Sequence, residues 1–99
     1  MKIIYTEQSF ESLELIKEYL TEKYSLKKAE AIRKEILDEA DHLVEFSERG
    51  QEEENLKELN LNHRYILKGH TKIIYRIEED KIYITDFFDS RQDPRKMKG

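Results

Sequence analysis

Cationic side chains collect in the C-terminal third of the chain, where they could bind an anion. Residues 61–99 carry 9 Lys and Arg against 6 Asp and Glu, a balance of +3, whereas residues 1–60 carry 9 against 16, a balance of −7, which together give the net charge of −4. The cations that could share an anion site are Arg64, Lys72, Arg76 and Arg91. On composition alone they are more readily explained as the solvated face of a sheet, since charged residues are mostly exposed. We assign Arg76 to that solvated face.

Histidine and carboxylate side chains offer a second kind of chemistry. His63 and His70 could act as acid–base groups or as metal ligands. The chain has no cysteine and no His-x-x-x-His spacing, which disfavours a metal site. Asp86, Asp89 and Asp93 could hold Mg²⁺, but the latter two are expected to pair with local cations instead. Nothing in the sequence indicates a nucleotide or flavin, so we expect no cofactor.

The segment that would position these residues is predicted to form two strands joined by a tight turn. In residues 71–77 the side chains alternate with the period of two that is typical of a strand, and residues 81–88 are rich in β-branched and aromatic side chains. Glu78-Glu79-Asp80 between them is too short for a parallel crossover and predicts an antiparallel hairpin. Because neighbouring strand residues face opposite ways, one of Phe87 and Phe88 could be exposed for a partner.

Two amphipathic helices are predicted before this hairpin, over residues 7–24 and 26–47. Their core-facing stripes are Phe10, Leu13, Ile16, Leu20 and Tyr24 in the first, and Ala29, Ile32, Ile36, Ala40 and Leu43 in the second. Thr6 and Ser25 are expected to cap the two helices, and Gly50 is expected to end the second. The small alanines would let the helices approach closely as an antiparallel hairpin.

Further strands are expected at residues 2–6 and 63–68, and the Glu52-Glu53-Glu54 run between them is expected to be a solvated loop. The element order is then β-α-α-β-β-β. This order predicts an α+β fold with two layers, in which an antiparallel sheet of about four strands is covered by the N-terminal helical hairpin. A chain of 99 residues is expected to form one domain over residues 1–99.

The composition predicts a soluble, cytoplasmic protein. The opening segment reaches Glu7 too soon to hold the apolar region of a signal peptide, and no apolar run approaches the length of a membrane span. Hydrophobic residues make up 37% of the chain and charged residues 40%. Such a polar balance suggests a thin two-layer domain, or one that leaves some apolar surface for a partner.

Three stretches of the sequence follow one another in a recognisable order and spacing. They are His63-Arg64-Tyr65, Gly69-His70-Thr71-Lys72-Ile73-Ile74-Tyr75-Arg76-Ile77 and Asp89-Ser90-Arg91-Gln92-Asp93-Pro94-Arg95-Lys96. With the preceding strand and helical hairpin, they resemble the RelE/ParE superfamily of type II toxin–antitoxin toxins over nearly the whole chain. The resemblance implies a small bacterial toxin held inactive by a cognate antitoxin protein, a segment of which wraps the groove and sheet of the toxin.

Members of this superfamily act by two mechanisms. One branch cleaves mRNA on the ribosome, a 2′-OH attack on phosphate that needs cations, a base and an acid. For this branch the resemblance assigns catalytic cations to Lys72 and Arg91, and Arg64 could join them across neighbouring strands. The other branch has a similar fold but inhibits DNA gyrase as a binding protein. In that case Arg91, Arg95 and Lys96 are the expected target-binding residues.

The residues after Arg91 depart from the nuclease branch. That branch carries a Tyr or His after its basic residues, whereas this chain has Met97, which cannot donate or accept the proton. Unless His63, His70 or Tyr65 substitutes, the acid–base pair is missing. The acidic net charge also fits poorly with docking onto ribosomal RNA. We therefore favour ParE-like inhibition of DNA gyrase, with ribosome-dependent mRNA cleavage as the alternative and a non-toxic binding relative as a third hypothesis.

Overall fold

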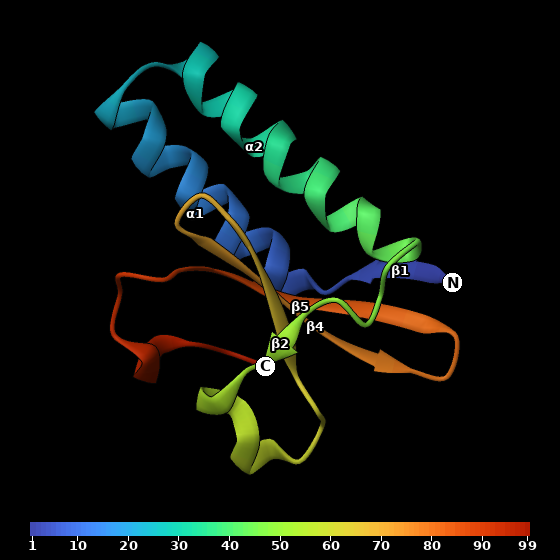
Figure 1. Cartoon of the computed structure of the whole chain (residues 1–99). Coiled ribbons are helices and arrows are strands. Elements are labelled where there is room, and N and C mark those ends of the chain that lie inside the picture. The colour runs from blue at the N-terminus through green and yellow to red at the C-terminus, as the bar shows by residue number, and fades with distance from the viewer.

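A helical hairpin lies on one face of a five-stranded sheet in the computed structural model, which describes all 99 residues (Figure 1). The helices are α1 (Glu7–Lys23) and α2 (Leu26–Asp41). The strands are β1 (Lys2–Tyr5), β2 (Gln51–Glu52), β3 (Arg64–Lys68), β4 (Thr71–Glu78) and β5 (Lys81–Asp89). Short 3₁₀ helices are η1 (His42–Val44), η2 (Glu54–Leu59) and η3 (Pro94–Lys96). The predicted α+β fold, a helical hairpin followed by strands, is confirmed.

The sheet is mixed and not purely antiparallel, which corrects the sequence prediction. Its strand order is β1-β5-β4-β3-β2. Strand β1 runs parallel to β5, with Ile3 opposite Ile82, whereas the other neighbours are antiparallel. A parallel pair needs a long connection, and the helices and strands between β1 and β5 provide it. The fifth strand is the short segment Gln51–Glu52, which pairs with the start of β3.

Side-chain caps and small residues shape the helical hairpin as the sequence predicts. Thr6 and Ser25 each accept a hydrogen bond from a backbone N–H in the first turn of α1 and α2, respectively. Ala29 and Ala40 are fully buried. Neither helix is both long enough and apolar enough to cross a membrane.

Helix α2 ends at Asp41, and not near Ser47 as the sequence predicts. The loop that follows α2 is held by a buried tyrosine, Tyr75. The Tyr75 hydroxyl donates a hydrogen bond to the Ser47 carbonyl at 2.7 Å and accepts one from the Gly50 N–H at 3.0 Å. Burial raises the pKa of this hydroxyl, so it stays protonated. A Cβ atom on Gly50 would lie 2.3 Å from the hydroxyl oxygen, so this close approach requires glycine.

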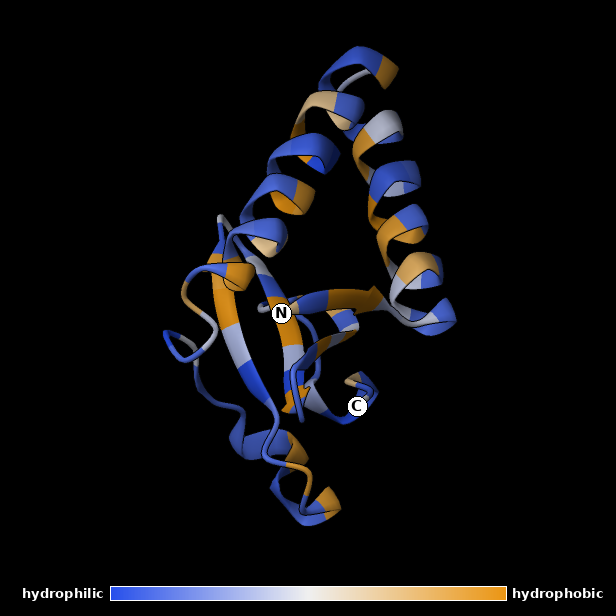
Figure 2. Ribbon diagram, turned by 90° about the vertical axis from the view of Figure 1, so that its right-hand side faces the viewer, coloured by the Kyte–Doolittle hydropathy of each residue, from blue (hydrophilic) through white to orange (hydrophobic).

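The main core lies between the helices and the sheet. Its buried members are Leu13, Ile36, Ala40, Leu43, Ile66, Ile73, Tyr75, Ile82, Ile84 and Phe87. Figure 2 shows the apolar colour on the sides of the helices that face each other and the sheet. The predicted stripe is wrong at Phe10, which is 46% exposed and packs its ring against Tyr5 at the edge of the sheet. It is also wrong at Tyr24, which lies exposed at the end of α1.

A bulge in β5 decides where its aromatic residues point. The pairing between β4 and β5 skips Thr85, so the alternation of side chains shifts by one residue beyond it. As a result Phe87 enters the main core, while Phe88 packs on the opposite face of the sheet. Both rings are buried, so the expectation that one of them is exposed for a partner is wrong.

The face of the sheet opposite the helices, here called the second face, carries a smaller core of Leu56, Ile74, Phe88 and Met97. Leu56 comes from η2 and Met97 from the C-terminal tail. We call the two segments that supply them, residues 53–59 and 94–99, the second-face cover. The prediction of a solvated loop at Glu52-Glu53-Glu54 is wrong for Glu53, which is only 2% exposed.

Candidate functional site

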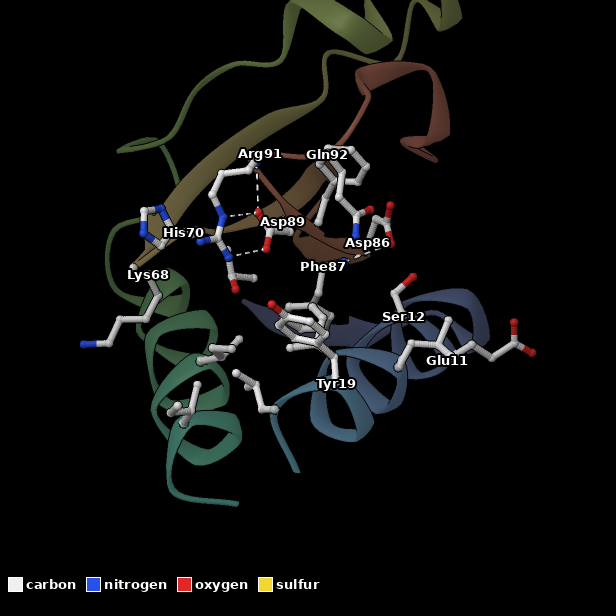
Figure 3. A pocket seen from close by; sticks show the side chains of 18 of the residues that line it. Glu11, Ser12, Tyr19, Lys68, His70, Asp86, Phe87, Asp89, Arg91 and Gln92 are labelled. Atoms are coloured by element: carbon white, nitrogen blue, oxygen red, sulfur yellow. Dashed lines mark hydrogen bonds and ion pairs between the residues drawn. The ribbon is translucent and has the colours of Figure 1, made fainter. Parts of the chain in front are cut away.

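An open groove separates the helical hairpin from the β3–β4 turn and the end of β5 (Figure 3). Its volume is about 890 Å³. Helix α1 lines one wall, and residues 68–71, 86–89 and 91–92 line the other. Ile16, Ile32, Ile36 and Phe87 are among its apolar lining residues. A groove of this kind, open to solvent and built on rigid elements, suits a segment of a partner protein.

Large apolar side chains are exposed along the α1 wall of the groove. They are Leu15, Tyr19 and Tyr24, of which Leu15 is 64% exposed. The Lys23 Nζ lies over both tyrosine rings, 5.7 Å from the Tyr19 centroid and 5.4 Å from the Tyr24 centroid. Aromatic and apolar side chains gathered at an open groove are typical of a surface that binds another protein.

The opposite wall carries an arginine held by a neighbouring carboxylate. The Arg91 Nη2 lies 2.8 Å from Asp89 Oδ2, and Arg91 Nε lies 3.0 Å from Asp89 Oδ1. These hydrogen bonds hold the pKa of Asp89 below its usual value. Figure 3 shows the pair beside His70 and across the groove from Tyr19. The guanidinium is thus oriented by Asp89 yet remains accessible to a partner.

The groove is more cationic than the molecule as a whole. Its cations are Lys23, Lys68, Arg91, Lys96 and Lys98. Its acidic residues are Glu11, Glu35, Asp86 and Asp89. Five cations against four carboxylates give a balance of +1, in a chain whose net charge is −4. Carboxylates of a partner therefore meet less repulsion at the groove than the net charge of the protein alone would suggest.

A buried carboxylate fastens the tail at the end of the groove. Asp86 is buried, and its two oxygens accept hydrogen bonds from the Phe87 N–H at 3.0 Å and the Lys98 N–H at 3.2 Å. Burial raises the pKa of Asp86, and these hydrogen bonds offset part of the effect. Asp86 therefore links β5 to the C-terminal tail.

Lys72 lies on the second face and does not line the groove. Its Nζ is 2.8 Å from Glu53 Oε2 and 4.2 Å from the centroid of the Tyr65 ring. It stands opposite Phe88 in the β4–β5 pairing, and the Phe88 ring belongs to the second-face core. The charge of Lys72 is thus neutralised by a buried carboxylate within the protein.

The guanidinium of Arg64 is hydrogen-bonded to main-chain oxygens. Its Nη1 donates hydrogen bonds to the Glu48 and Gly50 carbonyls, both at 3.1 Å. Arg64, like Lys72, does not line the groove that Arg91 lines. The structure therefore does not bring together the three cations considered for RNA cleavage.

The tail after β5 separates its basic residues from its methionine. Asp93 accepts hydrogen bonds from the backbone N–H and the guanidinium of Arg95, which is highly exposed, and Lys96 lines the end of the groove. The expected pairing of Asp89 and Asp93 with local cations is thus observed. Met97, by contrast, is buried in the second-face core.

The groups that could have replaced the missing acid and base are dispersed. His63 is buried, and burial lowers its pKa. His70 lies exposed on the β3–β4 turn at the groove, and Tyr65 lies under Lys72. Nowhere do three or more His, Asp or Glu side chains gather closely enough to hold a metal ion.

Sequence reasoning missed the α1 wall of the groove and the role of Glu53. Leu15 and Tyr19 fall outside the predicted core stripe of α1, and two large apolar residues on a helix face that should be polar are a signal that could have revealed the wall. The buried ion pair of Glu53 had no comparable signal, since a run of three glutamates is typical of a solvated loop.

A helical hairpin packed on a mixed sheet, with an open and cation-rimmed apolar groove, defines a small α+β protein built to bind another macromolecule. Residues 3–94 match the family model described as the ParE toxin of the type II toxin–antitoxin system parDE. The chain therefore belongs to the ParE toxin family, and it is the toxin component of such a system.

One solved structure, described as the chromosomal ParDE TA system from P. aeruginosa, resembles this chain with a TM-score of 0.74. The match covers 88% of this chain and 92% of that chain at 17% sequence identity. At this identity the likeness bears on the fold alone. No sequence among the curated proteins matches this chain.

Proposed function

We propose that this toxin inhibits DNA gyrase by binding to it, and that an antitoxin segment neutralises the toxin by occupying the groove. The observation that carries the first part is the separate placement of Arg64, Lys72 and Arg91. Arg91 lines the groove, Lys72 is paired with Glu53, and Arg64 is hydrogen-bonded to backbone carbonyls. This placement supports a mechanism that does not require the three cations around one scissile phosphate.

Cleavage of RNA requires cations, a base and an acid around a single phosphate. Here Lys72 is paired with Glu53, and Arg64 is hydrogen-bonded to backbone carbonyls. Met97, which occupies the region where the nuclease branch carries Tyr or His, is buried in the second-face core. A protein that acts only by binding needs none of these groups in one place, so the geometry supports the binding mechanism over the nuclease mechanism.

The cations that follow β5 are the proposed contact with gyrase. Arg91, Arg95 and Lys96 are exposed. Asp89 and Asp93 orient the two guanidinium groups through hydrogen bonds. Exposed ion pairs of this kind are weak, so a carboxylate on the target can replace the aspartate at little cost.

Supercoiling by purified DNA gyrase, titrated with purified toxin, tests this proposal. We expect wild-type toxin to abolish supercoiling, and we expect the Arg91→Ala and Arg95→Ala variants to require a higher concentration. The matched control is Lys34→Ala, which removes an exposed cation of α2 outside the groove. A toxin that leaves gyrase unaffected but cuts mRNA on ribosomes would contradict the proposal.

The groove is tested separately with the protein encoded next to the toxin gene. Leu15→Glu places a carboxylate on the α1 wall, and we expect it to weaken binding about tenfold or more, because interface centres exclude charge. Phe46→Glu is the matched control, since Phe46 is 61% exposed and lies outside the groove. Equal binding by both variants, measured by calorimetry, would place the antitoxin elsewhere.

A further inference from the structure

The side chain of His63 is buried without a hydrogen-bond partner. Only 2% of its surface is exposed, and neither Nδ1 nor Nε2 is hydrogen-bonded. Buried polar side-chain atoms nearly always have at least one partner, and an orphaned one calls for an explanation. His63 belongs neither to the groove nor to the proposed contact with gyrase, so its role lies elsewhere.

The His63 ring sits where both segments of the second-face cover meet the sheet. Its backbone carbonyl accepts a hydrogen bond from the Glu53 N–H at 2.8 Å. Gly99 lies so close that a Cβ on it would be 2.8 Å from the ring Nε2 and 2.7 Å from Leu59 Cδ1. His63 therefore contacts the segment that begins at Glu53 and also the C-terminal tail.

Charged groups on two neighbouring elements act on the ring. The Arg76 guanidinium, on β4, disfavours a positive charge there, whereas the Glu53 carboxylate, next to η2, favours one. The Glu53 carboxylate already accepts hydrogen bonds from Lys72 Nζ and from the backbone and side-chain amides of Asn55. A protonated ring would thus be buried beside Arg76 with two N–H donors and no acceptor, an unfavourable state.

We propose that protonation of His63 opens the second-face cover, so that this face of the toxin is acid-sensitive. When residues 53–59 and 94–99 lift from the sheet, the ring reaches water and can take up a proton. Opening also separates Leu56 and Met97 from the sheet side of the second-face core.

Proton linkage sets the size of the effect. In the closed state, burial and Arg76 lower the pKa of His63 below the ordinary value of 6.5, which the ring regains when the cover is open. Protons therefore bind the open state more tightly. At pH 5.5 the open population should therefore be larger than at pH 7.5, by up to about tenfold.

Hydrogen exchange of the full chain, followed by NMR at pH 7.5 and 5.5, tests the proposal. The reporters are the backbone amides of Glu53, Leu56 and Met97, each hydrogen-bonded within the cover or to His63. We expect their protection factors, corrected for intrinsic exchange, to fall at pH 5.5, by up to about tenfold. The amides of α2 should keep their protection factors.

Two variants assign the effect to this histidine. His63→Leu removes both unsatisfied nitrogens and should abolish the fall in protection of the cover at pH 5.5. Asp86, whose carboxylate also holds the tail, is retained in that variant, so a response that came from Asp86 would persist there. His42→Gln, which removes an exposed histidine, should behave as wild type.

Protection of the wild-type cover that stays constant or rises at pH 5.5 would overturn the proposal, and so would an equal fall in His63→Leu. If His63→Leu is unfolded by circular dichroism at pH 7.5, the ring titration of the wild-type protein decides. We expect the His63 midpoint to lie below that of a free histidine, and a midpoint at or above it would overturn the proposal.

Discussion

The Lys72 ammonium lies 2.8 Å from the Glu53 carboxylate, which is almost completely buried beneath it. Lys72 comes from β4, whereas Glu53 caps the start of η2, so the pair joins the sheet to one half of the second-face cover. The Tyr65 ring packs under the ammonium and limits its contact with water. The charge of Lys72 is thus engaged within the fold, whereas Arg91, on the groove, is the cation that we propose binds the target.

Removal of one partner of this pair should be costly. Lys72→Met leaves the Glu53 carboxylate buried and uncompensated, and we expect the free energy of unfolding to fall by about 3 kcal/mol. The double variant Glu53→Gln/Lys72→Met removes both charges, and we expect it to lose only about 1 kcal/mol. Chemical denaturation of the two single variants and the double variant measures the coupling.

An exposed ion pair provides the control for that cycle. Lys34 and Asp38 on α2 are 3.0 Å apart and both are largely exposed. Their separate and joint replacement by alanine should give almost no coupling, because water screens such pairs. If the coupling energy of Lys72 and Glu53 is no larger than that of Lys34 and Asp38, then burial does not strengthen the Lys72–Glu53 pair.

The architecture could be predicted from the sequence wherever it depends on local patterns. The caps at Thr6 and Ser25 and the hairpin of β4 and β5 follow from residue types within a few positions of each other. The parallel pairing of β1 with β5 could not be predicted, because it joins segments at opposite ends of the chain. Nothing in the residues of either strand indicates which strand it pairs with. The bulge at Thr85 was equally hidden, and with it the burial of both Phe87 and Phe88.

The candidate site was predictable only in part. The sequence identified Arg91, Arg95 and Lys96 as candidate target-binding residues. The structure leaves all three exposed, and Arg91 and Lys96 line the groove. The positions of Lys72 and Arg64 depended on which groups lie beside them after folding. Lys72 pairs with Glu53, and Arg64 with carbonyl oxygens of the loop after α2. These partners are distant in sequence from the two cations, so no local pattern predicts the contacts.

The contact between Tyr75 and Gly50 should be sensitive to small changes. Tyr75→Phe leaves the Ser47 carbonyl and the Gly50 N–H without their partner, and we expect a loss of about 1–2 kcal/mol in the free energy of unfolding. Gly50→Ala should cost about 1–3 kcal/mol, because its Cβ would collide with the Tyr75 hydroxyl. Urea denaturation measures both, and a Gly50→Ala variant as stable as wild type would show that the loop is not held by this contact.

The buried carboxyl of Asp86 should give stability a characteristic dependence on pH. Its pKa is raised in the folded protein, so the folded state binds this proton more tightly than the unfolded state, whose aspartate keeps the ordinary value of 3.8. This group therefore adds stability as pH falls through its raised pKa towards 3.8. As the pH is lowered from 7 to 4, the free energy of unfolding of the wild type should increase relative to that of Asp86→Asn.

Wild type and Asp86→Asn both contain His63, whose lowered pKa changes stability with pH in the opposite direction. The contribution of His63 therefore cancels in the difference between the two proteins. Denaturant titrations at several pH values provide the data. A difference between wild type and Asp86→Asn that is constant over this range, or that changes in the other direction, would mean that the Asp86 carboxyl is not penalised by burial.

Arg91 should affect function without affecting the fold. Its side chain is exposed and its hydrogen bonds are to Asp89, two residues away, so Arg91→Ala removes little packing. We expect an unchanged melting temperature and circular-dichroism spectrum, together with weaker inhibition of gyrase. Loss of the folded spectrum in Arg91→Ala would reassign this arginine to a structural role.

The central claim is that Lys72 and Arg91 serve different surfaces, one structural and one for binding. Growth of cells that express the toxin without its antitoxin tests this claim most directly, with folded Arg91→Ala compared with folded Glu53→Gln/Lys72→Met. We expect Arg91→Ala to restore growth and the double variant, which lacks the Lys72 charge, to remain toxic. A double variant that is folded and harmless, beside an Arg91→Ala variant that still stops growth, would contradict the account.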